Sequence, residues 1–291
     1  MSYRDLYCTK YSGFLNLNIP YSEAEFVLFG VPLDASASFV GGARFGPESI
    51  RRASLNLETF DFEDRIDVKK LRLIDIGDVD IDNSSLEENL NRVEKVVSEI
   101  ISDSKKPLVL GGEHTLTLGT TRCLRKFALL CFDAHLDLRD EYVGSKLSHA
   151  SVMRRVLGET RVEKIVFVGT RAVSTEEYKF VKDNPKITII SAGEALDVGF
   201  TGVADRINDE FKDCGDIYVS IDIDVLDPSA APNVGNPEPG GFSYEFTRKL
   251  ISKFSGNIVG ADITEVAPVL NIDITSIFAA KLAFDLLKKM K

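Results

Sequence analysis

The 291-residue sequence predicts an α/β fold, because short apolar runs typical of buried strands alternate with amphipathic helical patterns along the chain. The runs are nearly continuous in Val, Ile, Leu and Phe, which favours a parallel sheet covered by helices on both faces. No linker or repeat divides the chain, so we expect one domain over residues 1–291. The candidate strands are 26–33, 71–79, 107–112, 128–135, 164–171, 187–191, 216–227 and 257–266.

Helical patterns lie between these runs. The clearest is 86–104, where apolar residues recur on one face, and Ser85 with Glu88 predicts a capping box at its start. Eight strands also fit a TIM barrel, which periodicity alone does not exclude; in either fold, functional side chains gather at the carboxyl ends of the strands. The other expected helices are 47–58, 117–127, 150–157, 175–183, 201–213, 243–254 and 274–290.

Composition excludes several classes of partner. The net charge of −10 argues against nucleic acid, which requires a basic surface. No apolar run approaches the roughly 20 residues of a membrane helix, so no membrane partner is expected. The first residues lack the order of a signal peptide, and the four cysteines are scattered without a CxxC pair. We therefore expect a cytoplasmic protein with reduced thiols.

The histidines are concentrated in one part of the chain. All three, His114, His135 and His149, lie close to the ends of predicted strands, in polar segments marked by glycine, serine or aspartate. A single histidine is more often structural than catalytic. Three out of three beside acidic motifs at strand ends indicate a functional site instead.

Aspartates alternate with other residues at two strand ends. "CFDAHLD" places Asp133 and Asp137 on either side of His135, and "SIDIDVLDP" places Asp222 and Asp224 two positions apart. In a strand, alternate side chains share a face, and carboxylates that repel one another inside a protein require a compensating cation. Asp227 precedes Pro228 and is expected only to form a turn.

The ligand chemistry predicts the kind of metal site. Four aspartates and two imidazoles without a thiolate suit Mn²⁺, Fe²⁺ or Co²⁺ better than a structural zinc ion. Six ligands exceed the need of one catalytic ion that must keep open positions, so two ions with bridging carboxylates fit better. Paired ions lower the pKa of a water between them, which makes a hydrolase the natural interpretation.

Five ordered motifs resemble those of the ureohydrolases, the family of arginase and agmatinase. A further segment, "FGVPLDASASFVGGARFGPESIRRAS" at 29–54, resembles the family's amino-terminal loop and first helix, and the resemblance extends from about residue 26 to 285. It implies a three-layer α/β/α arginase-like fold with an eight-stranded parallel sheet, and two Mn²⁺ ions per chain. The five motifs are "GGEHT", "DAHLD", "SHAS", "SIDIDVLDP" and "ADITEVAP".

The resemblance also implies a role for each site residue. His149 is the acid/base histidine, Glu265 pairs with the guanidinium of the substrate, and Asp137 additionally hydrogen-bonds the attacking hydroxide. Glu113 stands where the family usually has Asp, and Ala150 where it often has Gly. One ion would be held by His114, Asp133, Asp137 and Asp222, and the other by Asp133, His135, Asp222 and Asp224.

The substrate implied is a small cationic guanidino compound. The "DEY" stretch at 140–142 resembles agmatinases, which produce urea and putrescine for polyamine biosynthesis. Arg139 leaves arginine, guanidinobutyrate and formimidoylglutamate open as substrates, with the loops 138–147 and 34–45 expected to choose among them. A single-zinc deacetylase-like enzyme and an inactive binding protein of the same fold are the alternatives of other classes. The family also implies a homo-oligomer, either a trimer or a hexamer.

Overall fold

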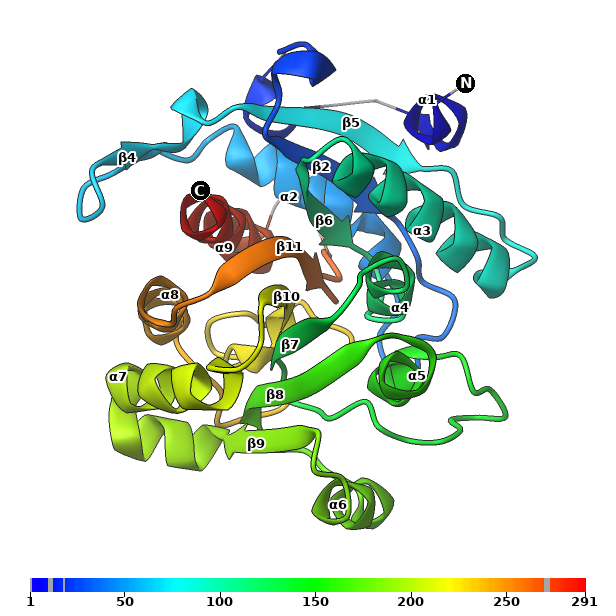
Figure 1. The fold of residues 1–291 in the computed structure, drawn as a ribbon, viewed down its shortest axis with the longest axis vertical. Coiled ribbons are helices and arrows are strands. Elements are labelled where there is room, and N and C mark those ends of the chain that lie inside the picture. The colour runs from blue at the N-terminus through cyan, green and yellow to red at the C-terminus, as the bar shows by residue number, and fades with distance from the viewer. Residues whose placement is uncertain (1, 10–12, 18, 270–272) are drawn as a thin grey trace.

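The computed structural model describes residues 2–9, 13–17, 19–269 and 273–291, and within these ranges a nine-stranded sheet runs through the molecule (Figure 1). Its order is β1-β5-β2-β6-β11-β10-β7-β8-β9. The short edge strand β1 pairs antiparallel with β5, and the other eight strands are parallel. The strands are β1 (Cys8–Thr9), β2 (Phe26–Val31), β5 (Leu73–Val79), β6 (Lys106–Gly111), β7 (Phe127–Phe132), β8 (Val162–Thr170), β9 (Ile187–Ser191), β10 (Asp216–Asp222) and β11 (Asn257–Thr264).

This arrangement confirms the predicted α/β fold with eight parallel strands and excludes a TIM barrel. In a barrel, strands would follow one another around a closed ring, whereas here β11 lies between β6 and β10 in the middle of an open sheet. Two strands outside this sheet, β3 (Phe60–Asp61) and β4 (Ile66–Asp67), form a small antiparallel hairpin.

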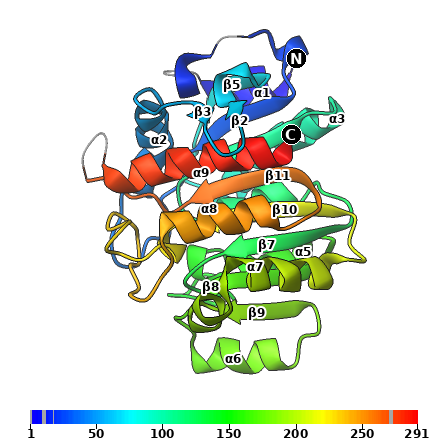
Figure 2. The ribbon, with the colours of Figure 1, turned by 90° about the vertical axis from the view of Figure 1, so that its left-hand side faces the viewer.

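Helices cover both faces of the sheet. Residues of α2, α7, α8 and α9 belong to one hydrophobic core, and residues of α3, α4 and α5 to the other. Figure 2 shows α7, α8 and α9 lying across the strands on one side. The helices are α1 (Tyr3–Tyr7), α2 (Gly46–Ser54), α3 (Leu86–Ser102), α4 (Leu116–Thr121), α5 (Val152–Glu159), α6 (Thr175–Lys182), α7 (Ala192–Phe211), α8 (Tyr244–Lys253) and α9 (Ile274–Met290).

Two local predictions require correction. Ser85 caps α3 by accepting a hydrogen bond from the Glu88 N–H at 3.1 Å, but the Glu88 carboxylate bonds Arg92 and does not complete the capping box. The complete capping box of this kind is at Ser174 and Glu177, before α6. The helix expected over 201–213 begins at Ala192, and left-handed backbone at Gly199 (φ 75°) divides it.

No helix among the described residues is long and apolar enough to cross a membrane. The main consequence of the parallel sheet for function is the position of the loops at one end of its strands. The carboxyl ends of its parallel strands open onto one edge of the molecule, where loops carry the predicted site residues.

Candidate metal centre and substrate pocket

Four neighbouring strands deliver the predicted ligands to one place. β6 leads into the loop of His114, and β7 leads into the loop of Asp133, His135 and Asp137. β10 and β11 lie between them in the sheet. Asp222 ends β10, Asp224 lies in the following 3₁₀ helix η6 (Ile223–Val225), and Glu265 follows β11.

The ligands converge for a different reason from the one the sequence indicated. β7 ends at Phe132, so Asp133, His135 and Asp137 lie in a loop and not on one face of a strand. Asp133 Oδ1 turns this loop by accepting a hydrogen bond from the His135 N–H at 2.6 Å, and Asp137 has left-handed backbone (φ 53°). Asp222 similarly accepts from the Asp224 N–H at 2.9 Å, which ends the strand expected over 216–227.

His114 lies at the centre of the deepest group. Its Nδ1 is 3.3 Å from Asp133 Oδ2, 3.1 Å from Asp137 Oδ2 and 3.4 Å from Asp222 Oδ2. The side chains of His114 and Asp133 have no exposed surface. Three carboxylate oxygens and one imidazole nitrogen therefore meet in a space shielded from water.

The hydrogen bonds of Ser220 and Asp262 determine which ring nitrogen of neutral His114 carries the proton and which one has the lone pair. Ser220 Oγ donates its proton to Asp262 Oδ1 at 2.6 Å, so it can only accept from His114 Nε2, which lies 2.9 Å away. Thr117 Oγ1 also donates to Asp262, at 2.9 Å. A histidine held through one N–H presents its other nitrogen to a metal, and this is the usual arrangement around metal ligands.

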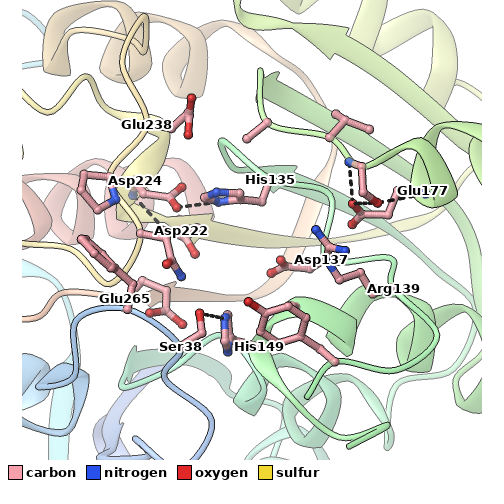
Figure 3. A pocket seen from close by; sticks show the side chains of 18 residues that line it. Ser38, His135, Asp137, Arg139, His149, Glu177, Asp222, Asp224, Glu238 and Glu265 are labelled. Carbon is pink, nitrogen blue, oxygen red and sulfur yellow. Dashed lines mark hydrogen bonds and ion pairs between the residues drawn. The ribbon is translucent and has the colours of Figure 1, made fainter. Parts of the chain in front are cut away.

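A second group adjoins the first. His135 Nδ1 is 2.9 Å from Asp224 Oδ2, and ligand atoms of Asp133, His135 and Asp224 all lie within 4.8 Å of one another. Asp224 Oδ1 accepts a hydrogen bond from the Ala134 N–H at 3.1 Å, which joins the loops after β7 and β10. Figure 3 shows the His135 and Asp224 side chains next to each other, joined by a dashed line.

The electrostatics of these groups fit divalent cations. Burial, followed by the charges of Asp224 and Asp133, raises the pKa of Asp222 well above its usual range. Burial and the charge of Asp133 raise the pKa of Asp137 to about 6. Burial opposes protonation of His135, yet Asp224 and Asp133 raise the pKa of that imidazole to about 12. The cluster thus attracts positive charge strongly, as a site for metal cations should.

Cys131 also lies beside this cluster but does not suit it as a ligand. Its Sγ is 4.0 Å from Asp133 Oδ2, and a sulfur, a histidine and a carboxylate together have ligand spacing there. Burial raises the pKa of the thiol, which keeps it protonated, whereas a metal ligand must be a thiolate. All four cysteines are free, as expected for reduced thiols.

The group of predicted metal ligands opens into a pocket of about 390 Å³, which His135, Asp137, Asp222 and Asp224 line (Figure 3). Glu265 lies on its wall with left-handed backbone (φ 65°), and its Oε1 accepts a hydrogen bond from the His114 N–H at 2.7 Å. Burial raises the pKa of Glu265 to about 8. Burial alone therefore favours its neutral form, and a cation that enters the pocket beside it would favour the carboxylate.

His149 lies on the pocket wall at the start of the 3₁₀ helix η5 (His149–Ser151), apart from the metal cluster. Its Nδ1 is 3.1 Å from Ser36 Oγ, its Nε2 is 3.3 Å from Ser38 Oγ, and the Tyr142 ring packs edge-on against it. No contact between its ring and the six predicted metal ligands is found in the described part of the chain. The geometry therefore separates this histidine from the other two.

Glu113 holds the loop that carries these serines. Its carboxylate accepts hydrogen bonds from the Ala35 and Ser36 N–H groups at 2.6 and 2.7 Å, and from the Ser36 and Thr115 hydroxyls at 3.0 and 2.7 Å. The sequence placed Glu113 near the ligands but did not indicate this role, since Ala35 and Ser36 lie far away along the chain.

Other pocket residues come from the two loops that the sequence predicts to choose the substrate, and Arg139 is among them. Loop 34–45 contributes Ser38 and Phe39, and loop 138–147 contributes Arg139 and Tyr142. The Arg139 guanidinium lies 5.3 Å from the centre of the Tyr142 ring. Glu177 and Glu238 also line the pocket and were not singled out, because a lone carboxylate in a loop carries no recognisable signal.

Asp227 is a turn residue, as predicted. Its carboxylate accepts hydrogen bonds from Ser229 N–H and Oγ–H and from the Gly240 and Gly241 N–H groups. It thereby ties the end of η6 to the loop that carries Glu238.

The fold and the site are those of a known class of enzyme: the chain belongs to the arginase family, whose model matches residues 24–288. It is an enzyme of the ureohydrolase type. Among its relatives, an agmatinase from Pyrococcus horikoshii is 35% identical over 270 residues, covering 91% of this chain and 92% of that protein. An N(1)-aminopropylagmatine ureohydrolase from Thermococcus kodakarensis is 37% identical over 279 residues, covering 93% of each.

Solved structures agree with this assignment. The crystal structure of agmatine ureohydrolase of Thermoplasma volcanium superposes with a TM-score of 0.88 at 35% identity, covering 97% of this chain and 95% of that one. An arginase from Bacillus cereus superposes with a TM-score of 0.78 at 26% identity, covering 90% and 98%. The arginase-like fold expected from the sequence is confirmed.

Proposed function

We propose that this protein hydrolyses agmatine to urea and putrescine with two Mn²⁺ ions per chain. The observation that carries the proposal is the position of His114 Nδ1, within 3.4 Å of buried carboxylate oxygens of Asp133, Asp137 and Asp222. Of these residues, Asp137 and Asp222 line the same pocket as Glu265. A cation-binding cluster and a separate buried carboxyl group, which a bound cation would ionise, suit a metal-dependent hydrolase of a cationic substrate. The names of several relatives support agmatine.

Six residues would hold the ions. We assign His114, Asp133, Asp137 and Asp222 to one ion, and Asp133, His135, Asp222 and Asp224 to the other. The fit rests on the lone pair that Ser220 leaves on His114 Nδ1 and on oxygen donors that suit Mn²⁺. Paired divalent ions supply a water of lowered pKa, and hence a hydroxide nucleophile at neutral pH.

The chain's own residues bind the substrate and handle protons. Glu265 accepts charge-assisted hydrogen bonds from the guanidinium and thereby orients its carbon above the cluster. Asp137 accepts a hydrogen bond from the nucleophile and thereby orients the attacking oxygen. His149 donates a proton to the departing amine, whose expulsion as a neutral group completes the cleavage.

The charge of the pocket supports a substrate with a second cationic group. Glu238 lines the pocket, and no hydrogen bond or ion pair of its carboxylate is found within the described residues. Glu177 differs, because its carboxylate accepts hydrogen bonds from the Leu138 N–H and from the Ser174 N–H and hydroxyl. Agmatine has a primary ammonium at the end of its tail, which the Glu238 carboxylate can attract, because the neighbouring Arg171 guanidinium donates to the backbone oxygen of Glu238, at 2.7 Å.

The position of Arg139 favours a substrate with a different tail. Arg139 lines the same pocket as a partly exposed cation and would attract the carboxylate of arginine or guanidinobutyrate. The name of the Thermococcus relative adds a longer polyamine tail as a further candidate. We assign Arg139 to the Tyr142 face, against which its guanidinium already lies.

The test is urea release after loading with Mn²⁺, with agmatine, N1-aminopropylagmatine, arginine and guanidinobutyrate at equal concentrations; formimidoylglutamate, which yields no urea, is followed by its own loss. We expect agmatine to have the highest kcat/KM. Brisk turnover of arginine without turnover of agmatine would refute the substrate, and hydrolysis that needs no divalent ion would refute the metal centre. We further propose that the reaction runs in the cytoplasm in polyamine synthesis, by a trimer or hexamer, which light scattering tests.

A further inference from the structure

The hydroxyl of Ser36 makes three polar contacts. Together they determine which ring nitrogen of neutral His149 carries the proton. Ser36 Oγ donates to Glu113 Oε1 at 3.0 Å and accepts from the His149 backbone N–H at 2.9 Å. The same oxygen lies 3.1 Å from His149 Nδ1. These three partners occupy the one proton and the two lone pairs that a hydroxyl offers.

The direction of the last contact follows by elimination. The only proton of the Ser36 hydroxyl is committed to the Glu113 carboxylate, so Ser36 has none to give to the ring. The contact is a hydrogen bond only if His149 Nδ1 carries the proton and donates it. The neutral ring then has its lone pair on Nε2, next to the hydroxyl of Ser38 at 3.3 Å.

We propose that Glu113 and Ser36 are positioning residues that hold His149 in the Nδ1-protonated tautomer, so that Nε2 alone takes up and delivers the catalytic proton. The inference rests on the proposed role of His149 in proton transfer. Glu113 acts through Ser36 and has no contact of its own with His149 among the described residues. Its two bonds to backbone N–H groups keep Ser36 in place, while its other oxygen takes the Ser36 proton.

This arrangement joins three separate segments of the site. Ser36 belongs to the loop after β2, Glu113 directly precedes the metal ligand His114, and His149 begins η5. A wrongly protonated ring would present an N–H toward the pocket in its neutral form and could not accept a proton there. The relay therefore removes the unproductive tautomer before substrate arrives.

Nitrogen NMR tests the tautomer without reference to activity. The chain has only three histidines, so protein labelled with ¹⁵N-histidine gives few ring signals, and His149→Asn identifies the relevant pair. Spectra are recorded on metal-free protein and again with Zn²⁺, because Mn²⁺ would broaden the signals. At a pH where the signals show a neutral ring, we expect the proton on Nδ1 in the wild type. A neutral ring protonated on Nε2 would overturn the proposal.

Variants separate positioning from general structural support. Ser36→Ala should let the Nε2 tautomer appear, lower kcat roughly ten-fold and leave KM within about two-fold, as expected for one lost orienting hydrogen bond. Ser36→Thr, which keeps the hydroxyl, should restore the wild-type tautomer, and Ser38→Ala should not change it. An unchanged tautomer in Ser36→Ala would refute the assignment. If the wild type has the Nδ1 tautomer but releases no urea from any substrate, the proposed function fails and the tautomer assignment stands.

Discussion

Glu265 and His114 are bonded to each other's loops: Glu265 Oε1 accepts from the His114 N–H at 2.7 Å, and the Glu265 N–H donates to Gly112 O at 2.9 Å. These bonds link the end of β11 to the loop after β6. The carboxylate that we assign to the guanidinium is thus fixed relative to the predicted metal ligands by backbone hydrogen bonds, and no hydrogen bond to its Oε2 is found among the described residues.

Glu265→Gln should lower kcat/KM for agmatine about ten- to a hundred-fold, because hydrogen bonds to charged groups contribute about 1.5–3 kcal/mol. The amide oxygen can still accept from His114, so the fold and the metal content should be unchanged. Steady-state kinetics together with elemental analysis measure both. A variant as active as the wild type would show that Glu265 does not hold the guanidinium.

Asp133→Ala and Asp222→Ala should each remove a bridging ligand, reduce the metal content below two ions per chain and nearly abolish urea release. Elemental analysis of purified protein counts the ions. Asp227→Asn is the matched control on the β10 side, because its carboxylate binds only a turn and should leave the metal content unchanged. Full activity with a single ion per chain would exclude a dinuclear centre.

His149→Asn should retain both ions but slow turnover by ~10²–10⁴-fold, the usual cost of losing a general acid or base. The reason is that the His149 ring contacts serines and a tyrosine and not the predicted ligands. Metal analysis and kcat on the same preparation decide the matter. An unchanged rate would show that protons move by another route.

Glu238→Gln should lower kcat/KM for agmatine and not for guanidinobutyrate, because the substitution removes the anion that we assign to the cationic tail of agmatine. Arg139→Ala should leave agmatine turnover within about two-fold, since its guanidinium lies against Tyr142. The ratio of kcat/KM values for the two substrates is the measurement. If wild-type protein prefers guanidinobutyrate and Arg139→Ala loses that preference, Arg139 is the residue that recognises the tail.

Asp227→Asn should be less stable than wild type at neutral pH and approach it as the solution becomes acidic. Hydrogen bonds from Ser229, then from the Gly240 and Gly241 N–H groups, lower the pKa of Asp227 to about 2, against about 3.9 unfolded. A depressed pKa contributes stability that is complete above the unfolded pKa and is lost as pH falls toward about 2. Urea unfolding of both proteins at pH 7, 4 and 3 measures the difference, and a constant difference would contradict this origin.

Much of the fold could be predicted because buried parallel strands are apolar throughout. β2, β6 and β7 contain continuous apolar runs, which are typical of buried parallel strands. The predicted ends of these strands lie within three residues of the observed ends. β1 was missed because two residues at an edge carry no periodicity. β10 was extended too far because "DIDVL" alternates as a strand does, whereas the Asp222 side chain turns the backbone into η6.

The candidate site was predictable where residue type carries the chemistry. Histidines and paired aspartates indicate a metal centre before any coordinates are known, and Glu265 was identified only through family resemblance. Ser36, Ser220 and Glu238 were not predicted, because serines and single glutamates are common and their significance depends on partners distant in the sequence. Their roles follow from hydrogen bonds that only the folded chain creates.

The strand order also determines when in folding this centre can exist. β6 and β11 are adjacent in the sheet, with Ala261 opposite Leu108, although about half of the chain separates them. Such distant pairings form slowly, since long loops must close first. No partly folded chain lacking these pairings can assemble the ligand set, so cations that bind it should favour the native state alone and slow its opening. Uptake of the ions would then report completion of the central sheet, and their removal should expose the protein first to proteolysis at the loops that surround the pocket.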